Sequence, residues 1–336
     1  MEKYSQFRDR ATGIAPFLPV VSEPAGIYLP IYICLFLFRL PFFVTLCATY
    51  FLFLQWFPLG SLFKKALLWM IMGIPGIWWI DLQIDGVKKG SLAKNESRVP
   101  SPSNVIASSF TSPLDSLYLA AIFDPIFTVS YPHTRQVEYI SLFGAILRAL
   151  SKPKEFPSKG AKMTDIKTLV RYHPKRIIVV FPECTTTNGR GTMPFSPSLL
   201  ATPPRTKIFP ISLRYTAADI TTPVSGEYWT FIWNLLSHPT HCIRVRIAEA
   251  VYNTSISPEV DKKFSTDALD SLGDESAISS STETLTSLSD QDMTEEEQKV
   301  LHRVGEALAR LGRVKRVSLT VTKKSEFIET WSKRKK

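Results

Sequence analysis

The segment Arg176–Arg190 reads RIIVVFPECTTTNGR. After its first arginine, Arg176–Phe181 is a continuous apolar run, which is typical of a strand buried on both faces of a sheet. A polar turn rich in threonine follows this run directly. A strand that ends in such a turn presents backbone N–H groups and hydroxyls. These groups suit a phosphate, but the segment taken alone fits an ordinary strand-to-turn junction with a solvated Glu183 equally well.

Strand and helix patterns alternate on both sides of this segment. Strands are predicted at Leu82–Val87, Asn104–Ser108, Lys207–Leu213 and Cys242–Ala248. Helices are predicted at Leu114–Phe127 and Tyr139–Leu150. Strands that alternate with helical patterns indicate an α/β domain, here residues 81–255, built as a mixed sheet flanked by helices.

The N-terminal region is much more apolar than this domain. Arg39 is the only charged residue between Ala25 and Phe63, and Ala66–Ile80 is uncharged. Residues 25–80 are therefore expected to form an apolar helical membrane anchor, either one span starting near Leu40 or helices lying within one leaflet. A buried helical hairpin of a soluble protein is less favoured, because the apolar run is longer than ordinary core helices.

Charge and cysteine content narrow the class of partner. The 336 residues carry a formal net charge of +10; residues 264–298 hold ten acidic side chains and no basic ones, so the remainder carries +20. A basic body suits an anionic partner, but no nucleic-acid motif is present, so a membrane surface or a phosphorylated substrate is expected. The four cysteines form no CxxC pair, and neither a disulfide scaffold nor a metal site is predicted.

The two ends of the chain differ from the domain. Residues 1–24 are expected to be a cytosolic segment, and the acidic, serine-rich residues 256–292 a disordered linker. Residues 293–336 are predicted to contain a helix that starts with a capping box of Thr294 and Glu297, a strand at Val317–Val321, and a basic tail.

Two sequence blocks carry a resemblance to a known family. Ser109–Asp115 (SFTSPLD) and Phe181–Gly189 (FPECTTTNG) resemble the first and third motifs of the glycerolipid acyltransferases, which typically read NHxSxxD and FPEGT. Lys207–Ile211 is similar to the fourth motif, and Tyr139–Leu150 lies where the second is expected but lacks its usual ending. The first 19 residues are similar to those of a fungal branch of this family, the lysophosphatidic acid:oleoyl-CoA acyltransferases.

The resemblance implies a membrane-bound enzyme that moves a fatty acyl group from acyl-CoA to the free hydroxyl of a lysophospholipid. Lysophosphatidic acid giving phosphatidic acid is the expected case. The implied partners are membrane lipids, acyl-CoA as co-substrate and a lysophospholipid, with no cofactor, no metal and no nucleic acid.

The resemblance also implies a location in the endoplasmic reticulum membrane. Basic residues follow the apolar segment and indicate that the catalytic domain faces the cytosol. An anchor within one leaflet would also permit lipid droplets, whereas a true span would forbid them because a droplet has no second leaflet.

In this family a His and an Asp five positions later form a catalytic dyad, in which the His accepts the proton of the acceptor hydroxyl. Asp115 falls on the Asp position and is the predicted catalytic residue. Phe110 falls on the His position, and its ring has no lone pair to accept a proton. His133 with Glu138 repeats the spacing with a longer acid, and direct action of Asp115 or a base from elsewhere in the fold are alternatives. A lipid-binding scaffold that keeps the fold without the chemistry is the competing hypothesis.

The resemblance implies a substrate-binding set that comprises Thr111, Ser112, Glu183, Thr185 and Arg190. The third motif is expected to hold phosphate, for which hydroxyls and a guanidinium are suitable donors. Lys207–Ile211 is expected to line the acyl or acceptor site. Cys184 replaces the usual glycine of the third motif and would be strained if this position takes a positive φ. A nucleophilic role for Cys184 is not expected, because nothing near it in sequence clearly lowers its pKa.

Overall fold

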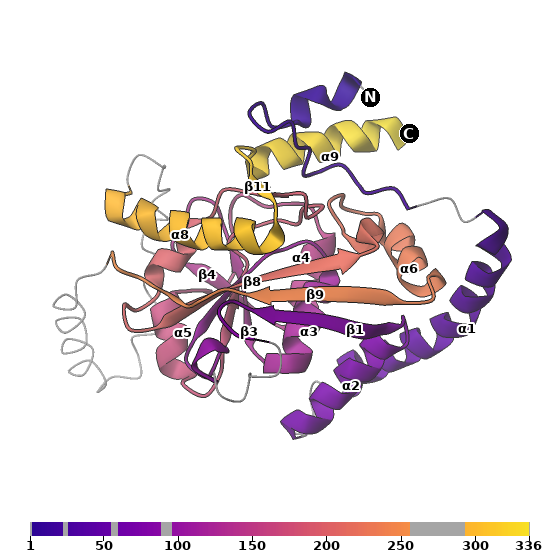
Figure 1. Ribbon diagram of the computed structural model, residues 1–336, viewed down its shortest axis with the longest axis horizontal. Helices are drawn as coiled ribbons and strands as arrows, with labels where there is room; N and C mark the ends of the chain where they lie inside the picture. Colours follow the sequence, from indigo (N-terminus) through magenta and orange to yellow (C-terminus); the bar gives the residue numbers. More distant parts are fainter. Residues whose placement is uncertain (1, 23–25, 55–59, 89–95, 256–292, 336) are drawn as a thin grey trace.

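The computed structural model describes residues 2–22, 26–54, 60–88, 96–255 and 293–335 (Figure 1). The apolar run at 176–181 supplies β6 (Ile178–Val180), which lies in the middle of the sheet between β2 (Val105–Ser108) and β3 (Ile126–Ser130) and is parallel to both. The other neighbour of β2 is β8 (Lys207–Thr216), also parallel. Every residue of β2, β3 and β6 is buried. This burial is expected where helices cover both faces of a parallel sheet.

The strands farther out make the sheet mixed, as the alternating sequence pattern predicts. Within the described residues the nine-stranded order is β1-β9-β8-β2-β6-β3-β4-β5, with β10 paired to β8. The outer strands are β1 (Ile77–Ile84), β9 (His241–Ile247), β4 (Val137–Ile140), β5 (Met163–Thr164) and β10 (Val251–Tyr252). Strand β9 is antiparallel to β8, β1 is parallel to β9, and β4 is antiparallel to both β3 and β5.

Helices cover both faces of the sheet. Side chains of a strand alternate between the two faces, so each strand contributes to two cores. In β2, Ile106 contacts one core while Val105 and Ala107 contact the other. The first core is covered by α2 (Ser61–Gly73), α3 (Pro113–Phe123), α4 (Leu142–Leu150) and α6 (Tyr228–Ser237). The second is covered by α5 (Ile166–Tyr172), η6 (Pro197–Ala201) and α8 (Glu295–Gly312). Two further short 3₁₀ helices are η5 (Glu96–Arg98) and η7 (Ala218–Ile220).

The two ends of the chain pack together and form what we call the terminal module, residues 2–22 with residues 315–335. Helix η1 (Glu2–Phe7) lies beside α9 (Val321–Lys335), with the ring centroids of Phe7 and Phe327 5.2 Å apart (Figure 1). Strand β11 (Lys315–Arg316) joins the module to the domain by pairing with β7 (Gly191–Thr192). The module therefore adds a third apolar core, which also contains Cys184 and Met193 of the domain.

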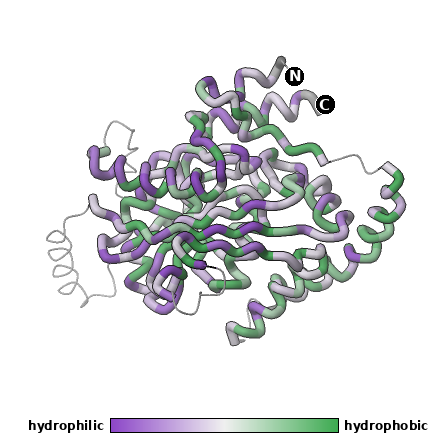
Figure 2. Tube along the Cα trace, in the orientation of Figure 1, coloured by the Kyte–Doolittle hydropathy of each residue, from purple (hydrophilic) through white to green (hydrophobic). Residues whose placement is uncertain are grey.

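The apolar N-terminal region forms α1 (Leu29–Ala48), extended by η2 (Gly26–Tyr28) and the π-helical turn η3 (Thr49–Leu54). Within the described residues, Gly26–Phe53 is the one helical stretch long and apolar enough to cross a membrane (Figure 2), and no residue in its most apolar window is buried. The guanidinium of Arg39 donates to the carbonyls of His238 at 2.6 Å and Pro239 at 2.9 Å, just beyond α6. This contact fixes the middle of α1 against the domain.

Several predicted boundaries are wrong. The helix predicted at Leu114–Phe127 ends at Phe123, because Asp124 takes a left-handed φ of 46° and Pro125 cannot continue the helix. Tyr139 and Ile140 belong to β4, and helix α4 starts only after Ser141, whose hydroxyl accepts from the Gly144 N–H.

Two predicted strands also differ. The first sheet strand begins at Ile77 rather than Leu82, because its pairing with β9 takes in the end of the apolar region. The segment predicted as a strand at Val317–Val321 is not a strand: residues 317–320 have no regular secondary structure, and Val321 begins α9. The backbone N–H of Ser318 donates to the Asp9 carboxylate rather than to a neighbouring strand. The capping box of Thr294 and Glu297 is confirmed, and the predicted linker 256–292 lies outside the described residues.

Asp9→Ala should loosen the terminal module. The buried carboxylate accepts from the backbone N–H groups of Thr12 and Ser318, both at 2.9 Å, and from both hydroxyls, which hold its pKa well below the usual range. Without these bonds, hydrogen exchange at Ser318 should be roughly tenfold faster or more. Exchange mass spectrometry measures this, with the exposed neighbour Arg10→Ala as control. Unchanged exchange in Asp9→Ala would contradict the role given to Asp9.

Candidate active site

The loop between β2 and α3 places Asp115 at the start of a helix. The Ser112 hydroxyl accepts from the Leu114 N–H at 3.3 Å, and the Asp115 carboxylate accepts from the backbone N–H groups of Thr111 at 2.6 Å and Ser112 at 2.9 Å. Both residues thus form a capping box that satisfies the free N–H groups of α3. Asp115 is completely buried as a result.

A tyrosine from β8, the strand next to β2, completes this carboxylate's environment. The Tyr215 hydroxyl, at the end of β8, donates to the carboxylate of Asp115. Burial raises the pKa of Asp115 to about 6, against the lowering effect of the hydrogen bonds from Tyr215 and the two backbone N–H groups. Burial and the Asp115 charge raise the pKa of Tyr215 well above its ordinary value, so its hydroxyl stays a donor. The sequence patterns did not reveal Tyr215, because only the β8–β2 register brings it to Asp115.

Phe110 fills the position at which the resemblance leads one to expect the base. Its buried ring stacks on that of Phe181 with centroids 4.4 Å apart, and both rings belong to the main core. Its backbone carbonyl accepts from the Thr187 N–H, which ties the two motifs together. Phe110 is therefore a hydrophobic core residue.

No histidine takes over at Asp115. The described residues include all five histidines, and none of them is a hydrogen-bond partner of Asp115. The alternative of His133 with Glu138 finds no support, because the His133 ring stacks on Phe156 and Glu138 accepts from the Tyr131 hydroxyl.

The third motif buries a second carboxyl group. Glu183 follows the end of β6, is only 3% exposed, and has one carboxyl oxygen, Oε2, without a hydrogen-bond partner. Burial raises the pKa of Glu183 to about 8, and the negative charge of Asp115 adds to this. The Met193 N–H and the charge of Lys324 oppose the shift. Glu183 is therefore mostly protonated at neutral pH and can act as a donor.

Cys184 occupies the position where the family has glycine, and its φ is +59°, in the left-handed region. The predicted strain is therefore present, since a residue with a Cβ is disfavoured there. The thiol is buried, and burial raises its pKa to about 12. A thiol with this pKa is not a nucleophile at neutral pH, as expected.

A lysine that the sequence patterns did not single out lies against the threonines of the third motif. Lys324 of α9 is only 1% exposed, and its ammonium donates to the hydroxyls of Thr185 at 2.9 Å and Thr186 at 3.0 Å and to the Thr186 carbonyl. Burial lowers its pKa to about 7, helped by the charge of Arg148 and opposed by Glu183. Nothing near Lys324 in sequence signals this role, because it lies 139 residues from Thr185.

Four of the predicted substrate-binding residues, Thr111, Ser112, Glu183 and Thr185, are buried, whereas Arg190 lies at the surface. Thr111 and Ser112 contact Asp115, Glu183 lies near its charge, and Thr185 contacts Lys324. Arg190 is exposed, and its backbone N–H donates to the side chain of the buried Asn188. The Ser112 hydroxyl donates to the Ile220 carbonyl and so holds a neighbouring loop.

The space beside this cluster is small. Thr111 and Glu183 line a cavity of ≈ 20 Å³ together with Ser212, Leu213 and Arg214 of β8. This is room for about one water molecule. The segment Lys207–Ile211, expected to line the site, instead supplies core residues, and the three residues after it line the cavity.

Comparison with known proteins supports the family resemblance. Residues 92–214, which include the two motifs, match the family model described as Acyltransferase. The chain is 27% identical over 262 residues to the "Putative lysophosphatidic acid:oleoyl-CoA acyltransferase" of Schizosaccharomyces pombe, covering 74% of this chain and 84% of the relative. It is 25% identical over 197 residues to "Lysophosphatidic acid:oleoyl-CoA acyltransferase 1" of Saccharomyces cerevisiae, covering 58% of this chain and 61% of the relative.

Lys324→Met should change the pH dependence of stability. The amine has a pKa of about 7 in the folded protein and about 10.4 in an unfolded chain. Between these values the unfolded chain binds more protons, so the wild-type free energy of unfolding should rise with pH, and methionine should remove this contribution. Thermal unfolding between about pH 7 and pH 10 tests this, with the exposed neighbour Lys323→Met as control. Parallel profiles for Lys324→Met and the wild type would contradict it.

Proposed function

Because this chain contains an acyltransferase-family domain and is a distant homologue of these fungal proteins, we propose that it transfers a fatty acyl group from acyl-CoA to a lysophospholipid at a membrane surface. Lysophosphatidic acid is the acceptor that the names of both relatives favour. The observation that carries the proposal is the buried cluster in which Asp115 and Glu183 of the two motifs meet.

In the proposed reaction Asp115 accepts the proton of the acceptor hydroxyl. The hydroxyl oxygen attacks the thioester carbonyl carbon, a C–O bond forms, the C–S bond breaks, and CoA leaves as its thiolate. With a pKa of about 6, Asp115 is largely ionised at neutral pH and is basic enough to assist. The Tyr215 hydroxyl holds the carboxylate in place.

Glu183 and Thr185 would bind the phosphate of the acceptor. A protonated Glu183 can donate a hydrogen bond to a phosphate oxygen, which an ionised carboxylate would repel. Lys324 donates to the Thr185 oxygen and therefore leaves the Thr185 hydroxyl proton free to donate. Arg190, exposed two residues beyond Asn188, would contribute long-range attraction to the phosphate.

Substrate entry requires a movement of the chain, since the cavity of ≈ 20 Å³ beside Glu183 holds neither substrate. The terminal module covers the third motif, with Asn188 donating to the carbonyls of Ala15 and Leu18 and Lys324 donating to Thr185. We assign the opening to this module, because these contacts place it directly over the third motif.

A scaffold that binds lipid without transferring acyl groups is the second candidate function. Phe110 favours it, because a core phenyl ring stands where the family has its base. Loss of a general base lowers rates by about 10²–10⁴ and leaves the contribution of substrate orientation intact. The same pocket can therefore serve either a slow enzyme or a binding protein.

We further propose that the protein sits in one leaflet of the membrane. Helix α1 lies along the domain, with Phe36 against Trp233, Tyr32 against His238, and Arg39 bonded to carbonyls beyond α6. A perpendicular span would pull these polar groups into the bilayer centre, at a cost of about 2.5–3.5 kcal/mol or more for an arginine. Trp78 and Trp79, about 70% and 71% exposed at the start of β1, are suited to the headgroup level.

Transfer of labelled oleoyl-CoA to lysophosphatidic acid by the purified full-length chain tests the enzyme. Wild-type turnover should fall about 100-fold or more in Asp115→Asn, and the wild-type rate should decline as the pH drops through about 6, where Asp115 becomes protonated. The hydrogen bond from Tyr215 lowers the pKa of Asp115. Tyr215→Phe removes this bond, so the pKa should rise and the decline in rate should move to higher pH.

Phe110→His distinguishes the two functions. No turnover in the wild type together with turnover in Phe110→His would favour the scaffold and reject the enzyme. Thermal unfolding of each variant separates loss of chemistry from loss of fold, which is needed for Asp115→Asn because Asp115 also caps α3. Tyr215→Phe leaves that cap in place.

The one-leaflet proposal predicts association with lipid droplets as well as with endoplasmic reticulum membranes. A helix lying in the surface layer fits a droplet monolayer, whereas a spanning helix does not. Fractionation of cells loaded with oleate, followed by immunoblotting of the full chain, measures the distribution. A carbonate-resistant protein absent from droplets would contradict the proposal and favour a span.

A further inference from the structure

The polar face of the sheet carries a row of arginines outside the candidate active site. The register of β9 places Arg246 beside Gln83 of β1 and Ser212 of β8, and places Arg244 beside Asp81 and Arg214. Residues two apart on a strand share a face, so Arg214, Arg244 and Arg246 lie on the same side. The intervening Val245 belongs to the core on the other side.

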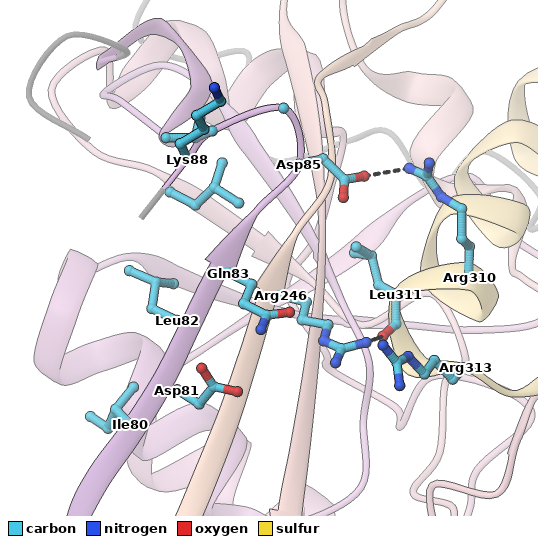
Figure 3. A pocket seen from close by; sticks show the side chains of 13 residues that line it. Ile80, Asp81, Leu82, Gln83, Asp85, Lys88, Arg246, Arg310, Leu311 and Arg313 are labelled. Atoms are coloured by element: carbon cyan, nitrogen blue, oxygen red, sulfur yellow. Dashed lines mark hydrogen bonds and ion pairs between the residues drawn. The ribbon is translucent and has the colours of Figure 1, made fainter. Parts of the chain in front are cut away.

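A cavity of ≈ 750 Å³ lies at this row, between β1, Arg246 of β9 and the C-terminal end of α8 (Figure 3). The size is in the range of small-molecule sites. Its charged lining residues are Lys88, Arg246, Arg310, Arg313, Asp81 and Asp85. Four of these are basic and two acidic, so the lining carries a net charge of +2.

The two acidic residues are already paired. Arg310 binds Asp85, and Arg244, at the margin of the cavity, lies 3.6 Å from Asp81. Within the described part of the chain, no carboxylate forms an ion pair with Arg246 or Arg313. The charges of Arg246 and Arg313 are therefore not paired with a carboxylate of the described residues.

Arg246 is held in a position to bind a ligand. Its Nη1 donates to the Leu311 carbonyl at 3.1 Å, and the stick view shows the side chain reaching from β9 toward the end of α8 (Figure 3). Its Nε is buried and has no hydrogen-bond partner. A buried N–H without a partner is unfavourable, and an incoming acceptor would satisfy it. Arg214 similarly uses one N–H on the Gly312 carbonyl.

Arg313, at the end of α8, has a strained backbone conformation. It caps α8 with φ +50°, a left-handed conformation in which glycine is the usual residue. Burial and the nearby charges of Arg244, Arg246 and Arg313 lower the pKa of Arg214, which shows how close the guanidinium groups lie. Strain and mutual repulsion at one place are tolerated in functional sites, where a ligand offsets them.

We propose that this arginine cavity binds a phosphate-bearing anion. Guanidinium groups bind phosphate oxygens in a bidentate manner, and Arg246 and Arg313 would supply these donors. The phosphate has two chemical sources: the nucleotide portion of CoA, or the headgroup of an anionic lipid such as phosphatidic acid. The inference stands apart from the proposed function, because it concerns binding and requires no acyl transfer.

The test compares Arg313→Asn and Arg246→Gln with the wild-type full chain in detergent. Asparagine removes the charge and tolerates the left-handed conformation, so Arg313→Asn should fold normally. Arg205→Asn, in an exposed turn, is the matched charge control. Calorimetric titration with CoA and with inorganic phosphate measures the soluble source. Co-sedimentation of reconstituted protein with phosphatidylcholine vesicles, with and without phosphatidic acid, measures the lipid source.

About tenfold weaker CoA binding in both cavity variants, with Arg205→Asn unaffected, would support the site and assign it to the CoA nucleotide. Unchanged CoA binding with reduced binding to phosphatidic acid vesicles would support it and assign it to a lipid headgroup. If all variants bind CoA, inorganic phosphate and phosphatidic acid vesicles as the wild type does, with unchanged melting temperatures, the proposal is overturned. Acyl transfer is not a readout, so a failure of the proposed enzyme function leaves this test intact.

Discussion

The carboxylate of Asp115 is the point on which the rest of the site depends. It caps α3 through the Thr111 and Ser112 N–H groups and binds the hydroxyl of Tyr215 from β8. One buried group therefore joins a loop, a helix and a distant strand. A buried carboxylate is tolerated only when such donors surround it, which explains why the local chain is arranged around it.

Two further ionisable groups are buried in the same region, Glu183 near Asp115 and Lys324 near Glu183, and each moves toward its neutral form. Burial raises the pKa of Glu183 and lowers that of Lys324, so the cluster avoids carrying full charges in a dry interior. Lys324 comes from the terminal module, so the two ends of the chain are part of the site rather than appendages. The same arrangement closes the site and makes the terminal module the element whose movement would open it.

Much of the architecture and part of the site could be predicted before the structure. The apolar run at Arg176–Phe181 indicated a central strand, and the resemblance of the SFTSPLD and FPEC segments to family motifs implied that Asp115 and Glu183 belong to one site. Element ends were less accurate. The helix predicted to reach Phe127 stops at Phe123, because a single left-handed residue before Pro125 was enough to start a new strand. The residue at which such a helix ends depends on the pairing available to the strand that follows it.

The sequence by itself determined the α/β class, the apolar N-terminal helix, the absence of a histidine at position 110 and the identity of the two carboxylic acids. The fold class and the helix follow from short-range periodicity and the missing histidine from residue type, whereas the two acids follow from the resemblance of their motifs. Only the tertiary structure decided that Tyr215 holds Asp115, that Lys324 binds Thr185, and that Arg246 and Arg313 share a cavity. These residues lie up to 139 positions apart, and their contacts arise from strand register and helix packing. Burial then sets their ionisation, which no local pattern can encode.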